Sequence, residues 1–361
     1  MYNPFVTEMP DNVAPGTHAR DYAELKKRVK AAGLMDRQPL FYTLVGLEPV
    51  LLVAASVTLL FVIHNFWLQL LNVLIFSLAF VRAGFMMHDA GHRQVFKKPR
   101  HNDLFGLFYS NFILGASISS WRVRHNEHHA HTNEIGVDPT LEIPLWAWIE
   151  EQAREKKGII QWFMKHQAMT FFPVLSLSGF FQTFAAVRDV FFGERVEDRF
   201  LQGSMLILHH ILYFGVLFIA LPWWQAVIFF VVHYLVTGLH LGMTFAPNHK
   251  GMPVVDADQE FDFLYIQAAT TRNVLPGPIR DYMYGGLNYQ IEHHLFPGMP
   301  RINLGKARQI TKQFLIDRQI PYYETGVVQS YREILRYMHE VGANLRAESK
   351  ARRRQPAQGN A

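Results

Sequence analysis

Residues 66–92 read FWLQLLNVLIFSLAFVRAGFMMHDAGH, an apolar run that ends in two histidines. The apolar part, about 66–87, has the roughly 20 residues that a helix needs to cross a bilayer. His88 and His92 are four residues apart, so on a helix their rings lie on one face, one turn apart. The stretch therefore predicts a membrane-spanning helix that carries metal-binding side chains just beyond one end.

Two further histidine clusters occur later in the chain. His125, His128 and His129 have the spacing i, i+3 and i+4, which again gives one helical face. His293 and His294 are adjacent, so on a helix their rings diverge by about 100° and can reach different metals. Neutral imidazole binds iron and zinc, but seven clustered histidines exceed the four positions of a zinc site. Their number favours two irons at the face of a membrane.

Four stretches are long and apolar enough to cross a membrane. The connectors after the first and after the third stretch are only a few residues long, so each pair is expected to form a helical hairpin. Both hairpin tips then lie on the same side. The predicted spans are about 41–63, 66–87, 204–221 and 224–246.

The basic residues avoid both hairpin tips and gather in the other segments. By the positive-inside rule those segments are cytoplasmic, which predicts a multi-pass membrane protein with both termini and all three histidine clusters on the cytoplasmic side. The N-terminal segment, 1–40, is polar. The C-terminal segment, 321–361, is expected to hold a helix and a basic tail, disordered beyond about residue 347.

Two apolar segments do not fit as spans. Residues 170–192 are long enough to cross, but a crossing there would put the second and third histidine clusters on opposite sides of the membrane. We therefore expect an interfacial or re-entrant helix. Residues 111–119 are shorter and are also expected to be interfacial.

The composition excludes several classes of site. The 361 residues contain no cysteine, which excludes disulfides, thiolate zinc sites, cysteine-ligated clusters and a cysteine nucleophile. Charged residues make up 18% of the chain, against about 25% in soluble proteins. The net charge of +5 suits anionic lipid or an acidic redox partner, and no basic patch interleaved with aromatic residues suggests nucleic acid.

Other residues are weaker candidates for the site. His249, at the end of the fourth span, is the eighth candidate ligand, and His240 lies about 13 Å deeper. Acidic neighbours of the clusters are expected to accept the second ring proton of a ligating histidine; these are Asp89, Glu127 and Glu292. The remaining histidines of the spans are expected to be structural, and His131 is expected to make outer contacts.

Three segments together resemble the membrane-bound fatty acid desaturase family. They are His88-Asp89-Ala90-Gly91-His92, the run from Trp121 to Asn133 that contains His125-Asn126-Glu127-His128-His129, and the run from Gly285 to Pro297 that contains Gln290-Ile291-Glu292-His293-His294. The resemblance covers about residues 41–320. Gln290, in place of the first histidine of the third box, is similar to front-end and acyl-lipid desaturases.

The resemblance implies four transmembrane helices in two hairpins with interfacial helices, capped by a cytoplasmic helical di-iron domain. It implies that two non-haem irons are ligated by eight histidines, which are His88, His92, His125, His128, His129, His249, His293 and His294. Gln290 and Asn248 are further residues of this site. Trp121, Arg122 and Arg272 are candidates to hold a substrate head group or to anchor the protein at the interface.

The implied reaction is oxygen-dependent insertion of a cis double bond into a long acyl chain carried as a lipid, CoA or carrier-protein ester. Family members from eukaryotes often carry a fused haem domain with a His-Pro-Gly-Gly signature, which this sequence lacks. We therefore expect a separate electron donor, such as a ferredoxin with its reductase.

Three alternatives stay open at the level of the sequence. A hydroxylase, ketolase or alkane mono-oxygenase would use the same scaffold and irons. A membrane zinc hydrolase would need about three protein ligands, fewer than are present. A metal transporter would place polar ligands along a path at mid-membrane, whereas these clusters lie beyond the ends of the spans.

Overall fold

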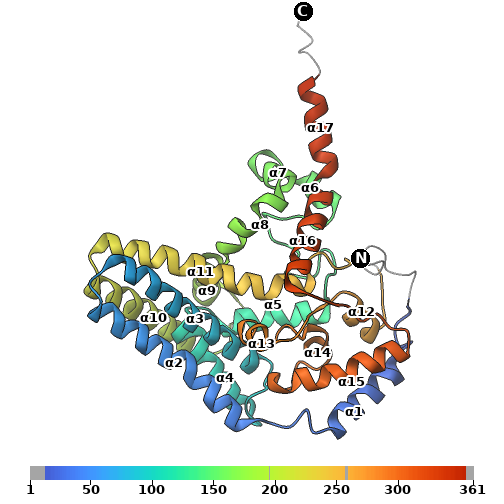
Figure 1. The fold of residues 1–361 in the computed structure, drawn as a ribbon, viewed down its shortest axis with the longest axis horizontal. Coiled ribbons are helices and arrows are strands. Elements are labelled where there is room, and N and C mark those ends of the chain that lie inside the picture. Colours follow the sequence, from blue (N-terminus) through green and yellow to red (C-terminus); the bar gives the residue numbers. More distant parts are fainter. Residues whose placement is uncertain (1–12, 195, 257–258, 355–361) are drawn as a thin grey trace, which may run out of the picture.

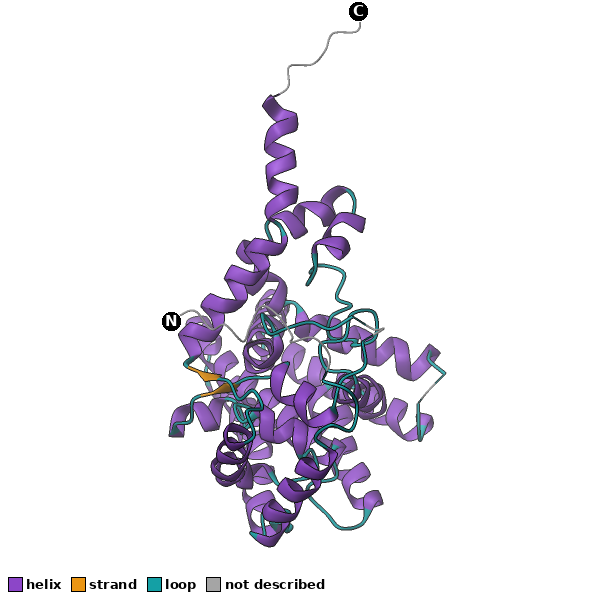
Figure 2. Cartoon of the chain, turned by 90° about the vertical axis from the view of Figure 1, so that its right-hand side faces the viewer, coloured by secondary structure: helices purple, strands orange, loops and turns teal. Residues whose placement is uncertain are grey.

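The structure is a computed structural model that describes residues 13–194, 196–256 and 259–354. Within these residues the regular secondary structure is almost entirely helical, as Figure 2 shows. The only named sheet in the described part has two parallel strands, β1 (Asn273–Val274) and β2 (Glu324–Thr325). The expectation of an all-α architecture is confirmed.

Four helices are long and apolar enough to span a membrane, and they lie side by side in Figure 1. Each agrees with a predicted span to within a few residues. The connectors between α2 and α3 and between α10 and α11 are as short as expected, so two hairpins form. The four helices are α2 (Pro39–Val62), α3 (Phe66–Gly91), α10 (Arg199–Ala220) and α11 (Trp223–His249).

The helix that carries the first histidine cluster, α3, is the most buried of the four. It packs against both α2 and α11. At its start the Asn65 side chain accepts hydrogen bonds from the backbone N–H groups of Trp67 and Leu68, at 3.0 and 3.2 Å, which caps the helix. In the interior, Asn72 and Ser56 bond to each other across the first hairpin. Such interhelical bonds fix the register of two helices in an apolar setting.

Residues 111–119 do not form the expected interfacial helix. They contain the end of a π-helix, η1 (Phe108–Leu114), and the beginning of α5 (Ile118–Ala130), which carries the second histidine cluster. Most of this segment is buried against α3 and α10. His209 of α10 contacts the Phe112 carbonyl at 2.9 Å, and Gly115, with a φ of 70°, leaves room for its ring. The prediction was wrong because these apolar side chains face other helices. The preceding helix is α4 (Pro99–Leu107).

Residues 170–192 form two helices, α8 (Gln167–Ser176) and α9 (Ser178–Phe192), bent by 57° at Leu177. Their junction touches the middle of α11, where a Cβ on Gly179 would lie 2.5 Å from the Tyr234 carbonyl. The bend has the shape of either a broken span or a re-entrant pair.

A cap of short helices covers one end of the four long helices, on the right in Figure 1. Its core joins the N-terminal helix to segments near the third histidine cluster. β1 and β2 pair with Asn273 opposite Glu324. The helices of the cap are α1 (Ala19–Ala31), α12 (Phe263–Ala269), α13 (Pro278–Met283), α14 (Gln290–Leu295), η2 (Arg301–Asn303) and α15 (Leu304–Asp317).

A separate group of helices projects from the side of the molecule (Figures 1 and 2). We call α6 (Glu150–Glu155), α7 (Gly158–Lys165) and α17 (Ala343–Arg354) the lateral arm; α16 (Val327–Val341) connects it to the cap. The chain was expected to be disordered beyond about residue 347, but α17 continues to Arg354. Leu345 explains the difference, because it is buried against α6 and α7 and fixes the start of the helix.

Candidate metal centre

Four elements bring the eight candidate histidines to one place at the capped end of the long helices. Two come from the end of α3 and three from α5. His249 is the last residue of α11, and the other two lie in α14. Because α3 and α11 belong to different hairpins, the site is built where the two hairpins meet.

The first group consists of His88, His92, His125 and His293. Their nearest ring nitrogens all lie within 4.8 Å of one another. The Nε2 atoms of His92 and His125 are 2.8 Å apart, and the ring centres of His88 and His293 are 4.6 Å apart.

The second group consists of His128, His249 and His294, whose nearest ring nitrogens also lie within 4.8 Å of one another. All three side chains are buried. The Nε2 atoms of His128 and His249 are 3.4 Å apart, and the ring of His294 lies 4.7 Å from that of His249.

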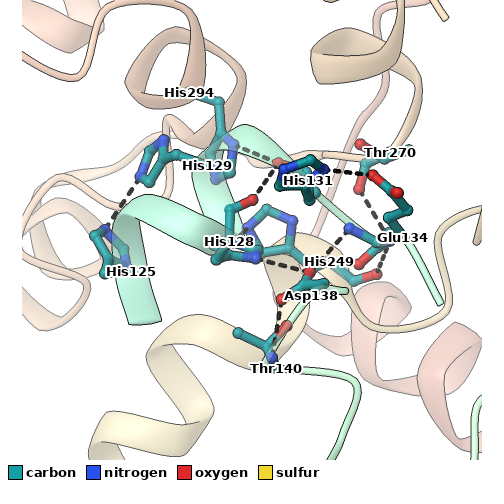
Figure 3. A network of polar contacts seen from close by, with 12 residues as sticks. His125, His128, His129, His131, Glu134, Asp138, Thr140, His249, Thr270 and His294 are labelled. Atoms are coloured by element: carbon teal, nitrogen blue, oxygen red, sulfur yellow. Dashed lines mark hydrogen bonds and ion pairs between the residues drawn. The ribbon is translucent and has the colours of Figure 1, made fainter. Parts of the chain in front are cut away.

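His129 lies between the two groups, as Figure 3 shows from one side. Its Nε2 is 3.1 Å from Nε2 of His125 in the first group. Its ring stacks on His294 of the second group with the centres 4.1 Å apart. The eight histidines therefore form two adjacent nitrogen sets joined by one shared ring.

The nitrogen atoms of this cluster fit metal ions. Several buried ring nitrogens lack a hydrogen-bond partner among the described residues, including Nε2 of His88 and His294 and both nitrogens of His293. An unpaired buried polar atom costs free energy, and a metal ion would satisfy these atoms.

The protonation state of the histidine rings also suits metal binding. Burial and the neighbouring histidines hold the pKa values of five rings well below the usual range, and these are His92, His125, His129, His293 and His294. A lowered pKa keeps imidazole neutral, the form that binds metal.

Asp138 orients one ring of the second group and was not found from the sequence. Its Oδ2 lies 2.8 Å from Nδ1 of His128 and accepts a hydrogen bond from the backbone N–H of Asn133 at 2.9 Å (Figure 3). The hydrogen bond with His128 and the charge of Lys250 outweigh burial and hold the pKa of Asp138 well below its usual range. An ionised carboxylate here fixes the proton on Nδ1, so that Nε2 of His128 is free to bind a metal.

Two more residues hold rings in the same way. Asp89 lies 3.3 Å from Nδ1 of His88 and forms an ion pair with Arg301 at 3.2 Å, which is the role expected of it. Gln267, also missed, places its Oε1 2.7 Å from Nδ1 of His294. No local pattern marks Gln267, because α12 reaches the site only through the folding of the cap.

Gln290 and Asn248 lie beside the second group. The side-chain amide of Gln290 is 3.0 Å from Nε2 of His249, and Asn248 bonds to Gln290 at 3.0 Å. Asn248 is itself held by the Leu287 carbonyl at 3.0 Å. The two amides therefore close one side of this histidine group.

Two of the three acidic neighbours do not contact the rings. Glu127 is exposed, because it precedes His128 by one residue and so points about 100° away from it on the helix. Glu292 is buried but accepts hydrogen bonds from Asn273 at 2.8 Å and Tyr322 at 2.9 Å. Burial raises the pKa of Glu292 to about 7. Asp138 and Gln267 occupy the places expected for these two carboxylates.

The candidates for a head-group site are differently placed. Arg272 is fully buried and binds Glu333 and the Lys250 carbonyl, each at 2.6 Å, so it joins α16 to the end of α11. Arg122 pairs with Asp103 at 2.7 Å, and none of its hydrogen bonds among the described residues goes to a histidine. Trp121 stacks on His125 with the ring centres 4.2 Å apart and forms a wall of the first group.

Two histidines that were expected not to be ligands lie outside the two histidine groups. His240 contacts the Met283 carbonyl at 3.0 Å, deeper in the bundle than His249. His131 pairs with Glu134 at 2.7 Å, outside both groups (Figure 3).

Comparisons with known proteins agree with this arrangement. Residues 42–326 match the family model described as fatty acid desaturase. The chain is 32% identical over 335 residues to the Delta(5) fatty acid desaturase fat-4 of Caenorhabditis elegans, covering 87% of this chain and 74% of that protein. It is 28% identical over 347 residues to the Delta(6)-fatty-acid desaturase fat-3 of the same organism, covering 91% and 76%. It is 29% identical over 350 residues to the Delta(8)-fatty-acid desaturase of Euglena gracilis, covering 92% and 81%. The chain therefore belongs to the fatty acid desaturase family, a family of oxidoreductases.

Proposed function

We propose that this chain is an oxygen-dependent acyl desaturase that uses two non-haem irons to insert a cis double bond into a long acyl chain. The observation that carries the proposal is the meeting of eight histidines from four elements in two adjacent nitrogen sets. The first set, with His88, would hold one iron and the second, with His128, the other. His129 lies within reach of both.

When bound, such an iron pair supplies the oxidising power that removes two hydrogens from neighbouring methylenes with dioxygen. The protein holds the rings and excludes water. Asp138, Asp89 and Gln267 hold three rings by their Nδ1 atoms, which leaves the opposite nitrogens free for metal. The burial of the second group keeps water from competing for the site.

The surroundings of the site suit an acyl chain. Gly84, one turn before His88, faces the side chains of Leu241 and Leu114, which gives an apolar wall close to the first histidine group. Burying each methylene contributes about 0.8 kcal/mol, so a long chain has ample affinity for an apolar path. The relatives are named Delta(5), Delta(6) and Delta(8) desaturases, and two others are named acyl-lipid (9-3)-desaturases. We propose a substrate of the same class.

We further propose that the histidine site and both termini are cytoplasmic. The arrangement of the histidines supports one side for all clusters, and the basic residues outside the hairpin tips favour the cytoplasm as that side. If α10 and α11 each cross the membrane, then α8 and α9 must return to the side on which they began. The bent pair is then re-entrant, as the bend of 57° permits.

Electrons are proposed to come from a separate one-electron carrier, such as a ferredoxin with its reductase. The chain has no cysteine to ligate an iron–sulfur cluster of its own. The net charge of +5 is suited to an acidic carrier.

The test is fatty acid methyl-ester profiling of a host that expresses the wild type or a His128→Ala, His129→Ala double variant, each with a ferredoxin and its reductase. The wild type is expected to give a new acid two mass units lighter than its precursor, and the variant none. Derivatisation then locates the double bond. A new acid that has gained one oxygen would establish a hydroxylase instead. Zinc in place of iron in the purified protein, with no oxidised product, would establish a hydrolase.

A further inference from the structure

The lateral arm carries an apolar stripe that nothing in the described structure covers. Ile159 and Trp162 of α7 are 68% and 42% exposed, and Met169 at the start of α8 is 68% exposed. Ile159 and Trp162 are three residues apart, so they lie on one side of α7, and Met169 follows just after the break at His166. The opposite side of α7 is filled, because Met164 is buried against Leu345 of α17. The exposed stripe is therefore an outer surface of a packed unit.

The stripe continues onto surface that belongs to the membrane-spanning region. Beyond the bend at Leu177, Phe181 and Phe184 of α9 are also exposed. α9 packs against both α10 and α11, two of the four spans. Exposed apolar residues thus occur along α9, at Leu177 and at the start of α8, between the long helices and α7.

The position of the arm relative to the two faces of the membrane can be estimated from residues along α11. Trp223 and Trp224 are exposed at the tip of its hairpin, as is typical of residues at a membrane interface. Gly242 is 19 residues after Trp223, or about 28 Å along the helix, close to the roughly 30 Å of a hydrocarbon core. Gly242 is where α8 touches α11, through Leu175. α8 thus leaves the bundle near the second face of the membrane.

Figure 1 shows α8 leading from α11 outward to α7, and α17 running across the direction of the long helices. The arm thus extends sideways from the bundle at the level of the lipid head groups.

Basic residues flank the stripe. Lys156 and Lys157 precede α7 and Lys165 ends it, and none of the three forms an ion pair with any residue that the structure describes. Arg154, by contrast, is paired with Glu150 and Glu348 within the arm. Free lysines beside exposed apolar side chains are the pattern of a helix that lies on an anionic membrane surface.

We propose that α7 is a membrane-surface anchor that inserts Ile159 and Trp162 among the lipids and binds anionic head groups through Lys156, Lys157 and Lys165. The arm thereby holds the bundle at a fixed tilt and gathers anionic lipid beside the re-entrant pair. The proposal concerns the arm alone and does not depend on the metal site.

The chain has no cysteine, so single-cysteine variants carry one label each. Ile159→Cys and Met169→Cys, with Glu151→Cys of α6 as control, would be labelled with a fluorophore and placed in lipid nanodiscs. We expect brominated lipid to quench the labels at 159 and 169, and aqueous iodide to quench the label at 151 several-fold more than either. Equal quenching by iodide at all three positions would overturn the proposal, and would mean that the stripe faces water or awaits a protein partner.

The choice of lipid is tested by the same fluorescence. With the label at 159, a given fraction of brominated phosphatidylglycerol is expected to quench about twofold more than the same fraction of brominated phosphatidylcholine. This preference should disappear in the triple variant Lys156→Gln, Lys157→Gln, Lys165→Gln. It should persist in a charge-matched control on α1, Lys26→Gln, Lys27→Gln, Lys30→Gln. Loss of the preference in both variants would show a general charge effect and overturn the role of α7. Circular dichroism of each variant, compared with the wild type, checks that the helix content of the protein is kept.

Discussion

At the scale of single residues, local spacing identified the histidines but not the groups that orient them. The expected helical faces place His88 near His92 and His125 near His129. Asp138 lies ten residues beyond His128 and Gln267 lies on another helix, so only the tertiary fold brings them to the rings. Glu127 was chosen because it is adjacent to His128 in sequence, but adjacency does not decide contact: Glu127 is exposed, whereas Asp89, equally adjacent to His88, contacts its ring.

The comparison of Asp138 with Glu127 gives a test with a built-in control. Asp138→Asn keeps the shape but removes the charge that holds Nδ1–H of His128, and the loss of such a partner lowers metal affinity by about 10- to 100-fold. Glu127→Gln is expected to leave iron binding unchanged, because its side chain is exposed. Iron per protein, measured by mass spectrometry after dialysis against a weak chelator, should fall only in the first variant. A similar loss in both would exclude this role for Asp138.

At the scale of elements, length and hydropathy predicted the four spans well. The connectors were also correct, since His64 and Asn65 lie outside both helices of the first hairpin. The π-helix and the bend between α8 and α9 were not predicted, because each depends on contacts with other helices. Gly179, for example, permits the close approach of the Tyr234 carbonyl of α11, a contact that no local pattern marks.

The junction of α8, α9 and α11 leads to a second prediction. A Cβ on Gly238 would lie 2.5 Å from the backbone nitrogen of Gly179, whereas a Cβ on Gly215 of α10 would meet nothing within 4 Å. Gly238→Ala is therefore expected to destabilise the protein by about 1–3 kcal/mol through overpacking. Gly215→Ala should be neutral or stabilising by up to about 1 kcal/mol, since alanine favours helix. Thermal unfolding of the two variants in one detergent provides the measurement. Equal midpoints would contradict the close backbone contact between Gly238 and Gly179.

At the scale of the whole molecule, the sequence predicted that all histidine clusters share one side, and the structure brings them into one site. The lateral arm and the continuation of α17 beyond residue 347 were not predicted. Their small core, around Leu345 and Met164, combines residues almost 200 positions apart. No short stretch of the sequence contains both of these residues.

The proposed orientation can be tested by labelling intact cells, again because the chain lacks cysteine. His64→Cys at a hairpin tip is expected to react with a maleimide that does not cross membranes. Lys27→Cys on α1 should react only after the cells are permeabilised, since basic segments stay in the cytoplasm. The reverse pattern would invert the orientation, and labelling of both without permeabilisation would contradict the hairpin arrangement.

Removal of iron is expected to loosen the cap as a unit. The rings from α3, α5, α11 and α14 would lose their common ligand, and a ligand that binds only the folded state stabilises it. Treatment with a strong chelator should lower the thermal midpoint by at least about 5 °C, and ferrous iron should restore it. The His128→Ala, His129→Ala variant should show a much smaller change. An unchanged midpoint in the wild type would mean that the histidine cluster is stable without metal.

Because the candidate ligands are spread along the chain, the ribosome makes them at different times. Five of the eight histidines, His88 to His129, leave the ribosome before α6 is made, while His249, His293 and His294 follow at least 120 residues later. At about 5–20 residues per second, that interval is on the order of ten seconds. Neither histidine group is complete in the early part, since each takes at least one ring from α11 or α14. If the two groups hold iron as proposed, neither can be filled until these later rings have been made, and a cell that makes the polypeptide faster than it can supply iron would accumulate an inserted but inactive precursor.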